Sequence, residues 1–129
     1  MAKGDLAAHW ISSARADLRV ARTVFRGRHW RHVVFLSHLC VEKSLKALLQ
    51  KESGRLPPKT HDLVALVQRL KRKPPAELDA FIGELSQLSV PTRYPDDLRK
   101  AGAVFDARFA DRCLRMSAKV FRWSEQAVK

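Results

Sequence analysis

The chain has 129 residues, of which 46% are apolar, so it has the length and composition of one domain with one ordinary core. Its 25 Lys and Arg residues outnumber 13 Asp and Glu residues, and the formal net charge of +12 favours nucleic acid, nucleotide phosphates or an acidic partner as ligands. A solvated, arginine-rich surface without a ligand would show the same imbalance. We therefore predict a single domain over residues 1–129 and leave the meaning of its charge open.

Targeting segments and special chemistry are not indicated. Residues 1–10 carry charges and no long apolar run, so we expect neither a signal peptide nor a membrane span, and we expect a cytoplasmic protein. Cys40 and Cys113 each fall in an apolar helical pattern and are expected to be core residues. The chain has no glycine-rich phosphate loop and no zinc-type spacing, so we expect no metal and no cofactor.

The first half of the chain predicts two long helices. Apolar residues recur every three or four positions over residues 5–25 and again over residues 32–53. Between them, residues 26–32 combine Gly27 with basic and aromatic groups and are predicted to be a loop. Gly54 stands where the second helix is expected to stop.

The second half predicts three further helices. The third is short, with Thr60 as its N-cap, and the fourth begins at Pro74 and Pro75. Residues 90–102 contain two prolines and are predicted to be non-helical, and the last helix is predicted over residues 105–127. No segment shows a strand pattern, so the predicted fold class is all-α, an up-and-down helical bundle of four to five helices.

Three short motifs occur in a distinctive order. They are VEKSLKALL at residues 41–49, KTHDL at residues 59–63 and TRYPD at residues 92–96. Together with the N-terminal helix they resemble the HEPN domain family, and the similarity covers nearly the whole chain. The resemblance implies a helical bundle that usually forms a symmetric dimer and is often encoded beside a minimal nucleotidyltransferase.

The resemblance also implies an activity. Many HEPN proteins are RNA-cleaving toxins, and the nucleotidyltransferase acts as the antitoxin by modifying the toxin. Active members cleave RNA without a metal, through an arginine followed a few residues later by a histidine near the start of the last long helix. This chain has no histidine after His61, so that pair is absent from its usual place.

The candidate catalytic residues are therefore His61 and Arg93. Imidazole changes its protonation state near neutral pH, so His61 could act as a general acid or base, or it could merely complete a helix terminus. Arg93 could grip a phosphate while Tyr94 stacks on a base. Alternatively, Tyr94 packs the loop onto the bundle and Arg93 pairs with Glu42 or Asp96.

Other candidates for contacts with a nucleotide or RNA lie on the second helix and in the first loop. Glu42, Lys43 and Lys46 lie on successive turns, and a structural role explains Glu42 and Lys46 adequately as an i,i+4 pair. Arg28 and Trp30 form a possible stacking platform for single-stranded RNA. Tyr94 and Asp96 belong to the same set of candidates.

Two basic stripes follow the helical period. One lies on the first helix and consists of Arg15, Arg19, Arg22 and Arg26. The other lies on the last helix and consists of Arg108, Arg112, Arg115, Lys119 and Arg122. Like charges on one face repel each other, which argues mildly for a bound polyanion, but acidic neighbours such as Asp17 and Asp111 could instead make each stripe a solvated face.

These patterns lead to one functional prediction and one alternative. We predict a homodimer that binds RNA or nucleotide phosphates as the toxin-like half of a pair with a minimal nucleotidyltransferase, with His61 and Arg93 carrying any RNA cleavage. The alternative is a non-catalytic, homodimeric module that binds a nucleotide or a partner.

Overall fold

The described part of the chain is entirely helical apart from its connections. The computed structural model describes residues 3–89, 92, 94, 96 and 105–129, and no strand occurs among them. The helices are α1 (Lys3–Arg26), α2 (Trp30–Ser53), α3 (Leu63–Arg69), α4 (Ala76–Ser86) and α7 (Ala107–Val128). The predicted all-α fold class is confirmed.

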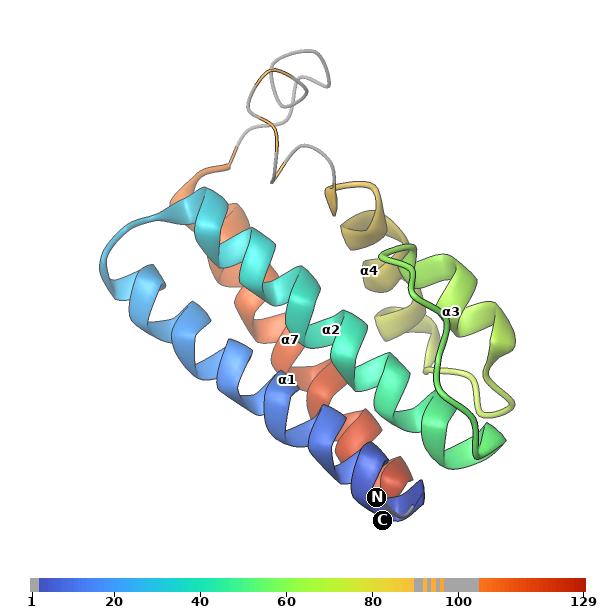
Figure 1. Cartoon of the computed structure of the whole chain (residues 1–129). Coiled ribbons are helices and arrows are strands. Elements are labelled where there is room, and N and C mark those ends of the chain that lie inside the picture. Colours follow the sequence, from blue (N-terminus) through green and yellow to red (C-terminus); the bar gives the residue numbers. More distant parts are fainter. Residues whose placement is uncertain (1–2, 90–91, 93, 95, 97–104) are drawn as a thin grey trace.

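Each of the three long helices packs against the other two, and the two short ones cover another side of α2 (Figure 1). Helix α1 is antiparallel to α2 and to α7, which both run away from the end of the bundle where α1 stops (Figure 1). The long connection after α2 runs back along the bundle, so α3 runs in roughly the same direction as α2 (Figure 1). None of the described helices is both long and apolar enough to cross a membrane.

Helix α2 is the centre of the core, because α1, α3, α4 and α7 all pack against it. Its apolar residues Val41, Leu45 and Leu48 meet Leu66 of α3 and Phe81 of α4 in one continuous cluster. A second cluster joins α1, α2 and α7 through Ile11, Leu18, Cys40, Ala47, Ala118 and Phe121.

Both cysteines lie in this core, as predicted. Desolvation by burial raises the pKa of the Cys40 thiol and of the Cys113 thiol to about 12. The thiolate is the reactive form, so both residues are chemically silent at ordinary pH.

We expect a thiol-alkylating reagent at pH 8 to modify neither Cys40 nor Cys113 in the folded protein and to modify both in denaturant. Intact-mass spectrometry over several hours measures the result. Native labelling at the rate of a free cysteine would show that burial does not protect the thiols.

The first connection is shorter than predicted. Helix α2 begins at Trp30, so only residues 27–29 separate it from α1, and the predicted loop over residues 26–32 was too long. Of the basic and aromatic residues that interrupt the apolar pattern there, Arg26, Trp30, Arg31 and His32 belong to the helices, and Trp30 and Arg31 are half-buried.

The start of α3 also differs from the prediction. The N-cap is Asp62, whose carboxylate accepts a hydrogen bond from the Ala65 N–H at 3.1 Å. Thr60 is not the cap, and its hydroxyl accepts a hydrogen bond from the Asp62 N–H at 3.1 Å. Both residue types favour caps, and the one nearer to the apolar run takes the position.

Part of residues 90–102 is helical, against the prediction. Thr92 and Asp96 are helical, and the Thr92 N–H donates to the Leu88 carbonyl at 3.1 Å. Proline disfavours helix at the residue before it, but Thr92 follows Pro91 and escapes that restriction. Arg93 lies outside the described residues. Helix α7 then begins after Asp106, whose carboxylate caps it.

Candidate functional site

Charged side chains are buried in the middle of α2, around the carboxylate of Glu42. Glu42 is 5% exposed and Lys46 is 7% exposed, although both are charged residues. The Lys46 Nζ donates to the Glu42 Oε2 at 3.0 Å, so the predicted i,i+4 pair is present. Because the pair is buried, removing one partner would lower stability far more than in the surface pair that the sequence suggested.

The connection between α2 and α3 brings His61 onto the same carboxylate. The His61 Nδ1 lies 2.8 Å from the Glu42 Oε1, and 62% of the His61 side chain is exposed. A carboxylate at Nδ1 favours the tautomer with its proton there and leaves Nε2 free to accept a proton. Because Asp62 caps α3, completing a helix terminus is not the role of His61.

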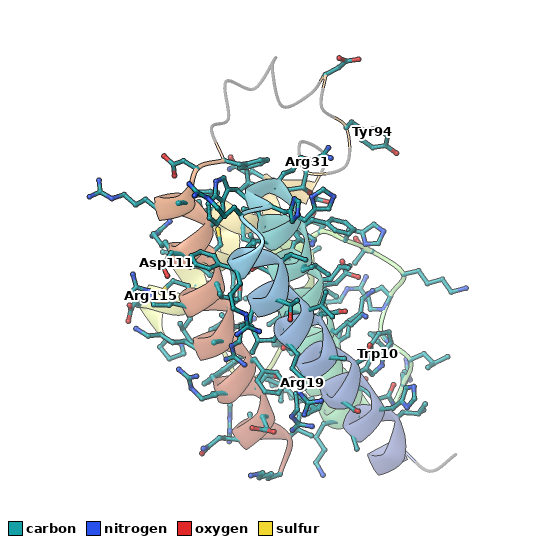
Figure 2. The ribbon with its side chains drawn as sticks, turned by 90° about the vertical axis from the view of Figure 1, so that its left-hand side faces the viewer. Trp10, Arg19, Arg31, Tyr94, Asp111 and Arg115 are labelled. Atoms are coloured by element: carbon teal, nitrogen blue, oxygen red, sulfur yellow. The ribbon has the colours of Figure 1, made fainter. Side chains whose placement is uncertain are left out.

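Two further side chains that the sequence analysis did not select lie beside Glu42 or beside its partner Lys46. His38 is completely buried one turn earlier on α2, with its Nδ1 3.8 Å from the Glu42 Oε1. From α1, Trp10 (labelled in Figure 2) places its ring centroid 5.6 Å from the Lys46 Nζ. The i to i+4 spacing of His38 and Glu42 was the available signal for the first. We call Glu42, His38, Lys46, His61 and Trp10 the Glu42 cluster.

His61 borders a shallow groove between α3 and α4. The groove has a volume of about 620 Å³, and Ser86, Gln87 and Ser89 also line it. A histidine held at one nitrogen by a buried carboxylate and open to a groove is an arrangement that serves general acid and base catalysis.

Ion pairs neutralise most of the basic stripe on α7. They are Arg112–Glu84, Arg115–Asp111 and Lys119–Glu77. Arg112 makes two hydrogen bonds to the carboxylate of Glu84, at 2.7 and 3.0 Å, and these bonds raise the pKa of the guanidinium above its usual value. Figure 2 shows Asp111 and Arg115 together on this helix. Arg108 and Arg122 are exposed, with no ion pair among the described residues.

Two more cations near α1 also have partners. Arg15 pairs with Glu125 of α7, and the Lys43 Nζ lies 2.8 Å from the Asp17 Oδ2. Lys43 therefore points away from the Glu42 cluster and toward α1, although the sequence placed it beside Glu42 and Lys46.

One group of cations without carboxylate partners lies at the end of the bundle where α1 stops and α2 begins. They are Arg22, Arg26, Arg28 and Arg31, and within the described residues none of them forms an ion pair. We call these four residues the basic end. Figure 2 shows Arg31 at the same end of the molecule as Tyr94, which is 59% exposed.

The turn that carries Arg28 has a definite backbone geometry. The His29 N–H donates to the Val24 carbonyl at 3.0 Å, and the Arg28 N–H donates to the Phe25 carbonyl at 2.9 Å. This is a Schellman motif, and Arg28 occupies its left-handed position with φ of 64°. Glycine normally fills that position, because a Cβ there costs about 1–2 kcal/mol.

Aromatic packing fixes the rest of this turn. The Trp30 ring packs edge-on against Phe25 with centroids 5.2 Å apart, so Trp30 is half-buried and is less open to a stacking base than the sequence suggested. A Cβ at Gly27 would lie 3.0 Å from the His29 Cδ2, a contact that a shift of a few tenths of an ångström in the exposed His29 ring relieves. The turn therefore presents Arg28 from a rigid support.

Comparison with known proteins identifies the family. The HEPN domain matches residues 7–127 of the chain. This chain belongs to the HEPN domain family. The crystal structure of ST0689, an archaeal HEPN homologue, is 27% identical, with a TM-score of 0.76 over 95% of this chain and 98% of that one. TT1696 from Thermus thermophilus is 23% identical and shares the fold, with a TM-score of 0.82 over 94% of this chain and 97% of that one. No curated protein matches the sequence.

The structure shows how the motifs of this HEPN domain relate to one another. Residues 41–49 supply Glu42 and Lys46, and residues 59–63 supply His61, so the first two motifs meet at one hydrogen bond. In the third motif, Tyr94 and Asp96 are exposed. Three predicted site residues thus lie in one cluster, and Arg28 and Trp30 lie elsewhere, at the turn between α1 and α2.

Proposed function

We propose that this HEPN protein binds single-stranded RNA through its basic end. The observation that supports the proposal is the uneven pairing of its cations: carboxylates pair with three of the five cations of the α7 stripe, whereas the four arginines of the basic end have no such partner among the described residues. Adjacent cations repel unless an anion offsets them, and phosphates bound by arginine release condensed counterions.

The proposed RNA path continues from the basic end toward the Glu42 cluster. Arg31 and Glu42 both belong to α2, and at a rise of ~1.5 Å per residue they lie roughly 16 Å apart along its axis. A few nucleotides of extended RNA span such a distance. Exposed Tyr94 offers a ring on which a base of this strand can stack.

Salt dependence tests the phosphate contacts. We expect Arg28→Gln combined with Arg31→Gln to reduce the slope of log K against log salt by about 1.4 for a single-stranded RNA, because each lost phosphate contact removes about 0.7. Fluorescence anisotropy of a labelled oligonucleotide at several salt concentrations measures the slope.

The matched control removes the same charge from α7, by combining Arg112→Gln with Arg115→Gln. It should leave the slope nearly unchanged, because carboxylates already neutralise these arginines. If both double variants reduce the slope equally, the RNA responds to net charge alone and the basic end is not its site.

Arg28→Gly separates stability from binding. We expect the variant to gain about 1 kcal/mol in its free energy of unfolding, since glycine relieves the left-handed backbone, while it binds RNA more weakly. Urea unfolding and anisotropy on the same samples measure the two effects. A variant that is more stable and binds RNA as well as the parent would exclude Arg28 from the contact.

A second candidate function is metal-independent cleavage of the bound RNA, and the hydrogen bond between His61 and Glu42 favours it. The His61 Nε2 would take the proton from a ribose 2′-OH, whose oxygen then attacks phosphorus and forms a 2′,3′-cyclic phosphate. The bond between phosphorus and the 5′ oxygen breaks as the departing oxygen takes up a proton from water, and Arg93 would hold the phosphate.

We further propose the assembly that family membership suggests. The protein would act in the cytoplasm as a homodimer and as the toxin-like half of a pair with a minimal nucleotidyltransferase. Light scattering at micromolar concentration tests the dimer, and co-purification with a neighbouring nucleotidyltransferase tests the pair. If RNA binds and is never cleaved, the protein is a binding module.

A further inference from the structure

The shallow groove that His61 borders continues along α3 and α4. A pocket of about 500 Å³ between these two helices adjoins it, and both are lined by Val64 and Gly83. We call the shallow groove and this pocket together the α3–α4 groove. We propose that it is a docking site for the apolar face of a short basic helix from a partner protein. The chain would thereby have a second kind of ligand, at a surface other than the basic end.

The floor of the α3–α4 groove is apolar. Val67, Pro74 and Ile82 line it and are buried, whereas Val64 of α3 is 41% exposed beside them. An exposed valine that continues a row of buried apolar side chains gives a partner a strip to remove from water. An amphipathic helix that lies in a groove between two helices removes such a strip.

Gly83 is an independent indication that a partner approaches α4 closely. It lies inside α4 and has no left-handed φ, and at such a position glycine is destabilising relative to alanine. Packing among the described residues does not explain it, because a Cβ at Gly83 would meet nothing within 4 Å beyond its chain neighbours and its own helix backbone. The missing side chain therefore leaves space in the α3–α4 groove.

The charge of the α3–α4 groove favours a basic partner. Asp62 lines the shallow part and Asp79 the pocket, and Asp79 is exposed with no ion pair among the described residues. Lys73 also lines the pocket, but its ammonium group donates to the carbonyls of Val67 and Gln68 at 2.8 and 3.2 Å. On a chain with a net charge of +12, these carboxylates attract cationic side chains and disfavour a phosphate chain along the groove.

The dimensions of the α3–α4 groove suit a helix of a few turns. Helix α4 has 11 residues, and at ~1.5 Å per residue it forms a wall roughly 16 Å long, which matches about three turns of a partner helix. Such a helix would place apolar residues on the strip at intervals of three or four positions. Its basic residues would then lie at the rim, beside Asp62 and Asp79.

The experiment first selects a probe. A display library of helical peptides of about 15 residues is bound to the whole parent protein after peptides that bind the Gly83→Leu protein have been removed. We expect the enriched peptides to repeat apolar residues every three or four positions and to carry Lys or Arg. A fluorescently labelled, synthetic copy of the most enriched peptide is then the probe for binding by anisotropy.

Variants of the groove test where the probe binds. Gly83→Leu fills the groove and should weaken probe binding at least about tenfold, since its side chain occupies the space of the partner. Ala80→Leu adds the same side chain at an exposed position of α4 that lines neither part of the groove, so it should bind the probe as the parent does. Asp79→Asn should weaken probe binding about twofold to fivefold, the range for one exposed ion pair.

Thermal melts separate docking from folding. Gly83→Ala should raise the melting temperature by about 2–5 °C, because alanine favours the helix and the fold does not need the glycine. A lower melting temperature would show that Gly83 serves the fold and would remove this support for docking. Val64→Gln, at an exposed position, should also weaken probe binding and replaces Gly83→Leu in the test if that variant fails to fold.

Other results would overturn the proposal. If no peptide is enriched, or if the probe binds Gly83→Leu as tightly as the parent, the groove is not a docking site. A lower mass of Gly83→Leu by light scattering would assign the groove to a second copy of the chain, and weaker binding of single-stranded RNA would assign it to RNA. We expect neither change, so failure of the docking site leaves salt-dependent RNA binding at the basic end intact.

Discussion

Replacing Glu42 with alanine is expected to lower the free energy of unfolding by about 3–5 kcal/mol, because a buried ammonium would lose its carboxylate. Lys46 is 7% exposed and its Nζ pairs with the Glu42 Oε2 at 3.0 Å. Urea unfolding followed by circular dichroism measures the loss.

The double variant Glu42→Leu with Lys46→Met distinguishes a buried charge from a packing defect. Removing both charges and keeping the volume should restore most of the stability, since a hydrophobic pair avoids the desolvation of two ions. Lys46→Met alone should be destabilised, because it leaves Glu42 with only its histidine partners. If the double variant is as unstable as Glu42→Ala, the loss comes from packing and not from the unpaired ammonium.

Replacing His61 with alanine is expected to reduce RNA cleavage by about 100-fold to 10,000-fold, the range for losing a general acid or base. RNA binding should change less than twofold, because the basic end is untouched. The assay uses a mixed pool of cellular RNA with a chelator and no added metal. His61 is largely exposed, so the variant should fold normally.

His9→Ala is the matched control, since His9 is exposed on α1 and belongs to neither site. It should cleave RNA as the parent does. Cleavage that survives His61→Ala would mean that another group or a contaminating nuclease is responsible. Intact RNA in every sample, together with salt-dependent binding, would establish the non-catalytic alternative.

Local sequence signals predicted the helices well and their ends less well. The apolar periodicity placed the long helices, but Trp30 begins α2 inside the predicted loop and Asp62 caps α3 instead of Thr60. Adjacent residues that all favour a helix terminus compete, and tertiary packing decides between them. Thr92 is helical although the two prolines led us to predict no helix there, because proline disfavours helix at the residue before it and not at the residue after it.

The site required contacts that local patterns do not contain. The hydrogen bond from His61 to Glu42 joins residues that are 19 positions apart, and the one from Arg112 to Glu84 joins residues 28 positions apart. The motifs indicated that His61 and Glu42 matter, but only the course of the connection after α2 brings them together. The same holds for the basic stripes, whose neutralisation depends on which carboxylates the neighbouring helices supply.

The antiparallel course of α1 and α7 determines how the molecule can be attached to other things. The first turn of α1 and the last turn of α7 lie side by side at the end of the bundle opposite the turn that carries Arg28 (Figure 1). A surface anchor, fluorophore or fusion partner joined after Lys129 would therefore leave the basic end facing the solvent. Immobilised in that orientation, the protein would expose the arginines of the basic end to ligands in solution.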